Sequence, residues 1–123
     1  MATEHEEQKN LIKWWAMYSS SKGIPEELLF AIPNGGKRDV ITANILRSEG
    51  VRPGVPDLFL AVETYDHAGL FIEMKRQKGG VVSHKQREFA DILQSHTSYL
   101  HRICRGFDEA RHCIEQYICT GEA

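Results

Sequence analysis

Hydrophobic and polar residues follow two different spacings along the chain, and each spacing predicts a different element. Between residues 4 and 20, Leu11, Trp14, Trp15 and Tyr18 recur at intervals of three and four, which predicts an amphipathic helix. Three further helices are predicted from similar spacing and from polar capping residues at their starts: 39–48, 83–95 and 107–119. Short apolar runs bounded by turn residues predict four strands: 28–32, 57–62, 69–75 and 99–104.

The order of these segments is α-β-α-β-β-α-β-α, and the connection at residues 65–69 is short enough to be a hairpin. This order predicts an α/β fold with a mixed central β-sheet and helices on both faces. No internal repeat or low-complexity tract interrupts the chain, so residues 1–123 are expected to form a single domain.

The composition is typical of a soluble globular protein, with 41% hydrophobic and 26% charged residues. The acidic N-terminus is unlike a signal peptide, and no apolar run approaches the roughly 20 residues needed to cross a bilayer. A cytoplasmic protein without membrane contact is therefore expected. The formal net charge of −2 argues against nucleic-acid binding by overall charge alone. Basic residues nevertheless cluster on both sides of segment 57–75, which allows a local positive face.

Three charged residues stand where strand residues should be apolar. Asp57 begins one predicted strand directly after Pro56, while Glu73 and Lys75 lie two residues apart on the returning strand and so share a face. Burying an unpaired carboxylate is costly, so Glu73 needs a compensating partner. A divalent cation shared with Asp57 would supply it. The alternative is that Asp57 caps a turn and that Glu73 and Lys75 are charges at a strand edge that pair with each other.

Two carboxylates, the backbone carbonyl of Met74 and several waters would make a suitable site for Mg²⁺ or Mn²⁺, since magnesium keeps much of its water in proteins. A bound cation acidifies water and stabilises charge on a phosphoryl oxygen. Lys75 would then orient the attacking water or stabilise the transition state. The spacing alone is compatible with metal-assisted chemistry at a phosphoryl group and with the alternative of paired charges at a strand edge.

Three ordered motifs resemble a known family. They are Gly54-Val55-Pro56-Asp57, Phe71-Ile72-Glu73-Met74-Lys75 and Ser83-His84-Lys85-Gln86. Together they resemble the PD-(D/E)XK nuclease superfamily, and more narrowly its VRR-NUC (virus-type replication-repair nuclease) group, including stand-alone phage and prophage members. The resemblance runs over nearly the whole chain and implies a restriction-endonuclease-like fold.

The resemblance implies that Asp57 and Glu73 bind the metal, that Lys75 is the catalytic lysine, and that Gln86 lines the site. The superfamily often adds a glutamate from the first helix. Glu4 projects near the centre of the apolar stripe of that helix and is preferred over Glu7. The alternative is that both are first-turn acids favoured by the helix dipole.

Several basic residues could contact DNA phosphates around the site, the alternative being a solvated basic surface. They are Lys37, Arg38, Arg52, Arg76, Lys78 and Lys85. Arg52 lies where the local sequence departs from the Val-Arg-Arg string behind the family name, which leaves its role open. The loop at 34–38 does not match a P-loop, so no nucleotide cofactor is expected.

The resemblance makes a DNA endonuclease selective for branched substrates the leading functional prediction, acting in DNA repair, recombination or phage replication. A four-way (Holliday) junction has approximate two-fold symmetry, which a homodimer with two sites would match. Two alternatives remain. One is a general or restriction-type endonuclease of the same superfamily, and the other is a nucleic-acid-binding module without catalysis.

Overall fold

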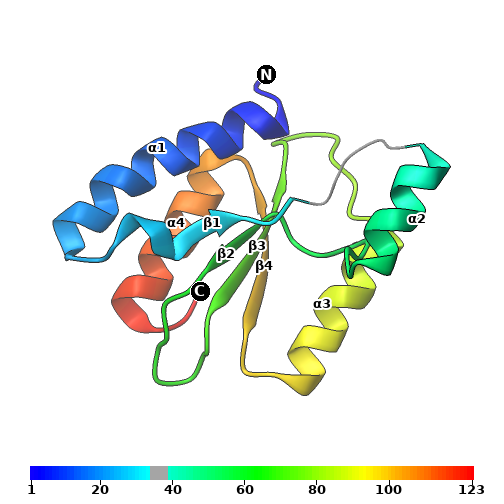
Figure 1. The fold of residues 1–123 in the computed structure, drawn as a ribbon. Coiled ribbons are helices and arrows are strands. Elements are labelled where there is room, and N and C mark those ends of the chain that lie inside the picture. Colours follow the sequence, from blue (N-terminus) through cyan, green and yellow to red (C-terminus); the bar gives the residue numbers. More distant parts are fainter. Residues whose placement is uncertain (34–38) are drawn as a thin grey trace.

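The computed structural model describes residues 1–33 and 39–123. Its elements follow the predicted order, with one additional short 3₁₀ helix (Figure 1). In chain order they are α1 (Glu4–Lys22), η1 (Glu26–Leu28), β1 (Leu29–Ala31), α2 (Val40–Ser48), β2 (Leu58–Leu60), β3 (Leu70–Lys75), α3 (His84–His96), β4 (Leu100–Arg105) and α4 (Phe107–Thr120). None of the described helices is long and apolar enough to cross a membrane.

The strands form one mixed sheet in the order β1-β2-β3-β4. The pairs β1–β2 and β2–β3 are antiparallel, whereas β3–β4 is parallel. The connection between β2 and β3 is the expected hairpin, and α3 makes the crossover to β4. The predicted α/β class with a mixed central sheet is therefore confirmed.

The hydrophobic core fills the space between one face of the sheet and the pair α1 and α4. The sheet contributes side chains that are almost fully buried: Leu58, Leu60, Leu70, Ile72 and Met74. Leu11 and Trp15 of α1 and Ile114 and Tyr117 of α4 pack against them. This two-layer packing fixes β3, because its core-facing residues are buried against helices from both ends of the chain.

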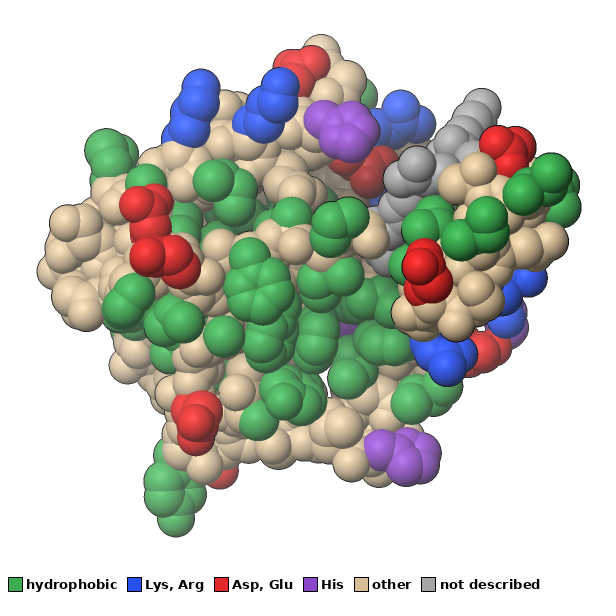
Figure 2. Space-filling model, in the orientation of Figure 1, with side chains coloured by type: hydrophobic (Ala, Val, Ile, Leu, Met, Phe, Trp, Pro, Cys, Tyr) green, Lys and Arg blue, Asp and Glu red, His purple; other side chains and the backbone are tan. Residues whose placement is uncertain are grey.

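The opposite face of the sheet is covered less completely. It carries a chain of contacting aromatic rings from Phe30, Phe59, Phe71 and Tyr99. Helix α3 lies on this side (Figure 1). In Figure 2, hydrophobic side chains gather in the middle of the visible face, over the strands and between the helices.

Two details differ from the pattern-based expectations. Helix α1 continues to Lys22 and ends at Gly23, whose φ of 68° is the left-handed conformation favoured at helix C-termini. Strand β1 was expected to be a buried run, but it is a half-covered strand in which Leu29 is buried and Phe30 is exposed. Three residues are too few for an alternating pattern to show which of them are buried.

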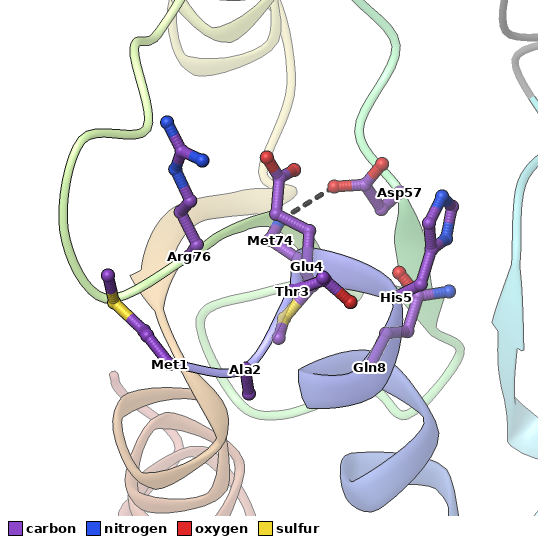
Figure 3. Close-up of a pocket in the computed structure, with 9 residues that line it drawn as sticks. All are labelled: Met1, Ala2, Thr3, Glu4, His5, Gln8, Asp57, Met74 and Arg76. Atoms are coloured by element: carbon purple, nitrogen blue, oxygen red, sulfur yellow. Dashed lines mark hydrogen bonds between the residues drawn. The ribbon is translucent and has the colours of Figure 1, made fainter.

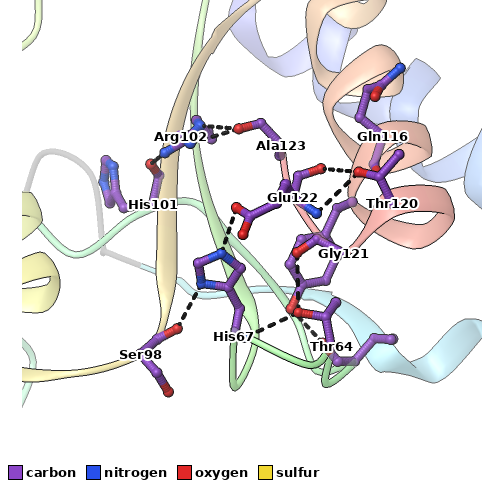
Figure 4. A network of polar contacts seen from close by, with 12 residues as sticks. Thr64, His67, Ser98, His101, Arg102, Gln116, Thr120, Gly121, Glu122 and Ala123 are labelled. Atoms are coloured by element: carbon purple, nitrogen blue, oxygen red, sulfur yellow. Dashed lines mark hydrogen bonds and ion pairs between the residues drawn. The ribbon is translucent and has the colours of Figure 1, made fainter.

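A network of polar contacts surrounds the loop between β2 and β3 (Figure 4). His67 contacts the backbone oxygen of Ser98 through Nδ1 at 3.1 Å and the Glu122 carboxylate through Nε2 at 2.8 Å. Thr64 donates to the backbone oxygen of Gly121 at 3.1 Å. These contacts tie the hairpin to the segments flanking β4 and α4.

Candidate active site

Asp57 lies directly before β2 and joins the strands on both of its sides. Its backbone oxygen accepts a hydrogen bond from the amide of Ile32 at 2.8 Å. Its side-chain Oδ2 accepts one from the amide of Met74 at 2.7 Å. The second contact holds the Asp57 carboxylate beside β3, the strand that carries Glu73.

Glu73 is a carboxyl group buried inside the fold, with only 2% of its surface exposed. Its Oε2 accepts a hydrogen bond from Nε2 of Gln86 at 3.0 Å. Its Oε1 is buried and has no hydrogen-bond partner among the described residues. Burial, the adjacent Asp57 carboxyl and, to a smaller extent, the charge of Glu4 raise the pKa of Glu73 to about 9, while Lys75 opposes this shift.

Lys75 lies two residues after Glu73 on the same face of β3. Its Nζ is 3.9 Å from Oε2 of Glu73, and the residue is 7% exposed. The backbone oxygen of Lys75 accepts a hydrogen bond from the amide of Gly106 at 2.8 Å, and Lys75 pairs with Arg105 in the parallel ladder. The end of β3 is thereby held in place on the β4 side.

Gln86 reaches Glu73 from the first turn of α3, and its amide is oriented by a capping box. Its Oε1 accepts from the Ser83 amide at 2.9 Å, while the Ser83 hydroxyl accepts from the Gln86 amide at 3.2 Å. Because Oε1 accepts the hydrogen bond of the capping box, Nε2 faces the Glu73 carboxylate. The same Ser-x-x-Gln spacing therefore starts the helix and directs a donor at the site.

The loop before Asp57 approaches α3 so closely that only glycine fits. Gly54 has a φ of 87°, and a Cβ on it would lie 2.3 Å from the backbone oxygen of Lys85. The loop carrying Asp57 and the helix turn carrying Gln86 are therefore in backbone contact. Gly54 had no role predicted from sequence, although its place in the Gly54-Val55-Pro56-Asp57 motif was a usable signal.

Glu4 projects from the first turn of α1 into a hollow of about 380 Å³ that Asp57, Met74 and Arg76 also line. In Figure 3, Glu4 lies between Asp57 on one side and Arg76 on the other. His5 and Gln8, which the sequence did not single out as site residues, complete the α1 side of this hollow.

Glu7 is placed differently from Glu4. It is 4% exposed, and its Oε2 accepts a hydrogen bond from the amide of Phe107 at 2.7 Å. Its Oε1 accepts a weaker one from Gln77 at 3.4 Å. Glu7 thus caps the start of α4, which has no side-chain cap of its own. Sequence spacing could not reveal this contact because it joins residues at opposite ends of the chain.

The basic residues predicted to contact DNA are dispersed around the site. Arg76 lines the hollow beside Glu4 and donates to the backbone oxygen of Gly79 at 3.3 Å, and Lys78 is exposed in the same segment. Arg52 and Lys85 line a separate hollow of about 180 Å³. Nζ of Lys85 is 4.0 Å from the Glu88 carboxylate. Lys37 and Arg38 lie outside the described residues.

The donor set fits a hard divalent cation that keeps part of its water. The described residues contain no group of three His, Cys, Asp or Glu side chains able to enclose a metal by themselves. They do place two carboxyl groups together, one of them with a buried oxygen that has no partner. A cation coordinated by these oxygens and by water would satisfy that oxygen and favour the ionised form of Glu73.

Comparison with known proteins identifies the chain as a nuclease-type domain. The family model of the VRR-NUC domain matches residues 2–108, so the chain belongs to the VRR-NUC family. A solved structure described as a VRR_NUC domain protein is similar with a TM-score of 0.78 and 26% identity, over 95% of this chain and 88% of that one. No curated protein matches the sequence. Family membership, predicted from the three motifs, is confirmed and implies a nuclease-type function on DNA.

Proposed function

We propose that this protein is a metal-dependent endonuclease that hydrolyses phosphodiester bonds in branched DNA. One observation carries the catalytic part of the proposal. The Glu73 carboxyl is buried beside Asp57, its Oε1 has no hydrogen-bond partner among residues 1–33 and 39–123, and Nζ of Lys75 lies 3.9 Å from its other oxygen. Burying a carboxyl oxygen without a partner costs free energy, and this cost is typical of groups that bind a ligand.

In this proposal Asp57 and Glu73 hold Mg²⁺ or Mn²⁺, with the Met74 carbonyl as a further oxygen donor and Glu4 contributing a carboxylate from the α1 side of the hollow. When bound, the cation supplies an acidified water and stabilises negative charge on the phosphoryl oxygen. Asp57 is already oriented for this role by the Met74 amide.

Lys75 and Gln86 act on either side of Glu73. The Lys75 ammonium orients the attacking water or stabilises the added negative charge on the phosphorus centre. Gln86 holds Oε2 of Glu73 by its hydrogen bond, which leaves Oε1 directed away from that donor. Among the predicted phosphate contacts, Arg76 is placed to position the substrate, since it borders the same hollow.

Selectivity for branched DNA and a homodimeric state complete the proposal. Both rest on the resemblance to stand-alone members of the family and on the two-fold symmetry of a four-way junction. Exposed apolar side chains support a subunit contact on this molecule. Phe30 of β1 is 46% exposed, and Ile41 and Ile45 of α2, which has no buried residue, are 73% and 54% exposed.

The test is cleavage of labelled four-way junction, flap and linear duplex DNA with Mg²⁺, Mn²⁺ or EDTA, comparing wild type with Lys75→Ala. We expect metal-dependent cutting that is fastest on the junction and is lost in the variant. Equal cutting of linear duplex would replace junction selectivity with a general endonuclease. DNA binding by a folded wild type that cuts nothing with either metal would identify a binding module instead.

A further inference from the structure

Helix α1 carries a row of basic side chains on its exposed surface. His5, Lys9 and Lys13 are spaced four residues apart, so they lie along one side of the helix and are all exposed. At 1.5 Å of rise per residue, the row is about 12 Å long. Figure 2 shows basic side chains along this helix, with a histidine and acidic side chains close to its N-terminal end.

This row leads directly away from the candidate active site. His5 and Gln8 line the hollow that contains Glu4 and Asp57, and they also line a second hollow of about 450 Å³. The second hollow is completed by Lys9, Ile12 and Lys13. A chain of phosphates leaving the active site over α1 would therefore meet the His5 ring and then the Lys9 and Lys13 cations in turn.

The two lysine charges of the row have no ion-pair partner in the part of the chain that the structure describes. Across residues 1–33 and 39–123, no described carboxylate forms an ion pair with His5, Lys9 or Lys13. Glu6, the adjacent acid on the helix, instead lies 3.3 Å from the Thr3 hydroxyl. Like charges four residues apart destabilise a helix by a few tenths of a kcal/mol, so this arrangement favours an anionic partner over the isolated helix.

The row also places basic side chains on the α1 side of the site, where no phosphate-binding residue has been assigned so far. Arg76, which is already a candidate for phosphate contact, stands on the opposite side of Glu4 from Asp57. With Arg76 on one flank and the lysines of α1 on the other, cations on both sides of the hollow favour a phosphate chain that crosses it.

We propose that His5, Lys9 and Lys13 bind the sugar-phosphate backbone of the DNA strand that continues past the cut on the α1 side. This rests on the nuclease function proposed above. At about 3.4 Å of rise per nucleotide along the duplex axis, a row of about 12 Å parallel to that axis spans three to four nucleotides. Because Lys9 and Lys13 contact phosphate alone, they contribute affinity without sequence preference.

The first test is DNA binding by full-length protein carrying Lys75→Ala, in Mg²⁺, using fluorescently labelled four-way junction and duplex. Adding Lys9→Gln and Lys13→Gln together should weaken binding about tenfold or more and reduce the salt slope of log K by about 2, because each phosphate contact contributes about 0.9. Lys9→Arg with Lys13→Arg should restore both values. The matched control is Lys22→Gln, which removes a charge from the far end of the same helix, where Lys22 lies over the Tyr18 ring.

The second test shortens the DNA on one side of the cut, one nucleotide at a time. The difference between the double variant and its parent should vanish once fewer than about three nucleotides remain on the α1 side. Unchanged affinity and salt slope in the double variant, with cleavage by wild type intact, would overturn the α1 site and leave the nuclease proposal standing. Lack of any DNA affinity in the parent would overturn both.

Discussion

Glu73 and Gln86 face each other across the candidate site, with Nε2 of Gln86 donating to Oε2 of Glu73 at 3.0 Å. The donor comes from a side chain that is also part of the α3 capping box. The start of a helix and the orientation of a buried carboxylate are thus set by one amide. This relationship makes the consequences of altering Gln86 specific.

Replacing Gln86 with alanine should lower kcat/KM for DNA cleavage about 10- to 100-fold, the range typical of lost partners of metal-binding residues. The comparison is Ser83→Ala, which removes the hydroxyl of the same capping box but leaves the Gln86 amide able to reach Glu73. We expect similar losses of thermal stability in the two variants but a large loss of activity only in Gln86→Ala. Equal activities would show that the contact with Glu73 does not serve catalysis.

The raised pKa of Glu73 predicts how stability depends on pH in metal-free protein. The pKa rises from 4.5 in the unfolded chain to about 9 in the fold, so the folded state keeps a proton that the unfolded state releases. The free energy of unfolding should therefore fall as pH increases between these two values. Glu73→Gln, which cannot ionise, should remove most of this dependence and be more stable than wild type at pH 8.

Urea denaturation in EDTA at pH 6 and pH 8 measures this effect. The free energy of unfolding of Glu73→Gln should exceed that of wild type by more at pH 8 than at pH 6. When Mg²⁺ replaces EDTA, it should stabilise wild type but not the variant, because only wild type binds the cation well. A constant difference between the two proteins at both pH values would contradict the burial-driven shift.

The two acids of the first helix should respond differently to substitution. Glu4→Gln should raise the Mg²⁺ concentration needed for half-maximal activity and leave the melting temperature nearly unchanged, because Glu4 faces the hollow. Glu7→Gln should instead destabilise the fold by about 1 kcal/mol, since Glu7 caps α4 through the Phe107 amide. Magnesium titrations of cleavage and thermal melts of both variants check this. A reversed pattern would assign the metal role to Glu7.

Gly54 should be intolerant of a side chain. Gly54→Ala places a Cβ against the Lys85 backbone oxygen, so the loop of Asp57 and the first turn of α3 must separate. We expect a destabilisation of about 2–4 kcal/mol, together with a loss of cleavage that exceeds the loss of folded protein. Gly50→Ala is the control for backbone strain alone, because Gly50 also has a positive φ, of 101°, but no atom within 4 Å of a built Cβ. Similar activities of the two variants would refute the positioning role.

The contact between His67 and Glu122 predicts a pH effect at the other end of the molecule. The Glu122 carboxylate raises the pKa of His67 above its usual 6.5, so the contact stabilises the fold fully below that value and is lost as pH rises through the raised pKa. Glu122→Gln should therefore cost more stability at pH 5.5 than at pH 8.5. Cleavage by the folded variant should match wild type, and a stability loss independent of pH would show that the ion pair is not formed.

The order of elements and the class of fold could be predicted because the helices have apolar residues at helical spacing and the strands are short apolar runs bounded by turn residues. Ser83 and Asp39 were recognised as caps from sequence, and both accept the expected backbone hydrogen bonds. The short strands were less certain at their ends, since Leu29–Ala31 has too few residues to show which face is covered. Local pattern thus identified the elements but not their exposure.

The grouping of Asp57, Glu73 and Lys75 could be proposed from sequence because a hairpin relates two adjacent strands. Contacts between segments that are distant along the chain could not be proposed from sequence. Glu7 and Phe107 are far apart in sequence, and no local spacing relates an acid in the first helix to the start of the last one. The contact of Gly54 with α3 was hidden for the same reason, although its positive φ is common for a glycine in a turn.

The two neighbours of β3 have very different separations along the chain, and this has a consequence for the order of folding. The hairpin pairs Leu60 with Leu70, whereas the parallel ladder pairs Leu70 with Leu100 after the whole of α3. Hairpins form within about 1–10 μs, while pairings that close longer loops are slower. The strand bearing Glu73 and Lys75 should therefore spend part of the folding reaction as an open edge, and the candidate active site should be complete only when α3 brings Gln86 against Glu73.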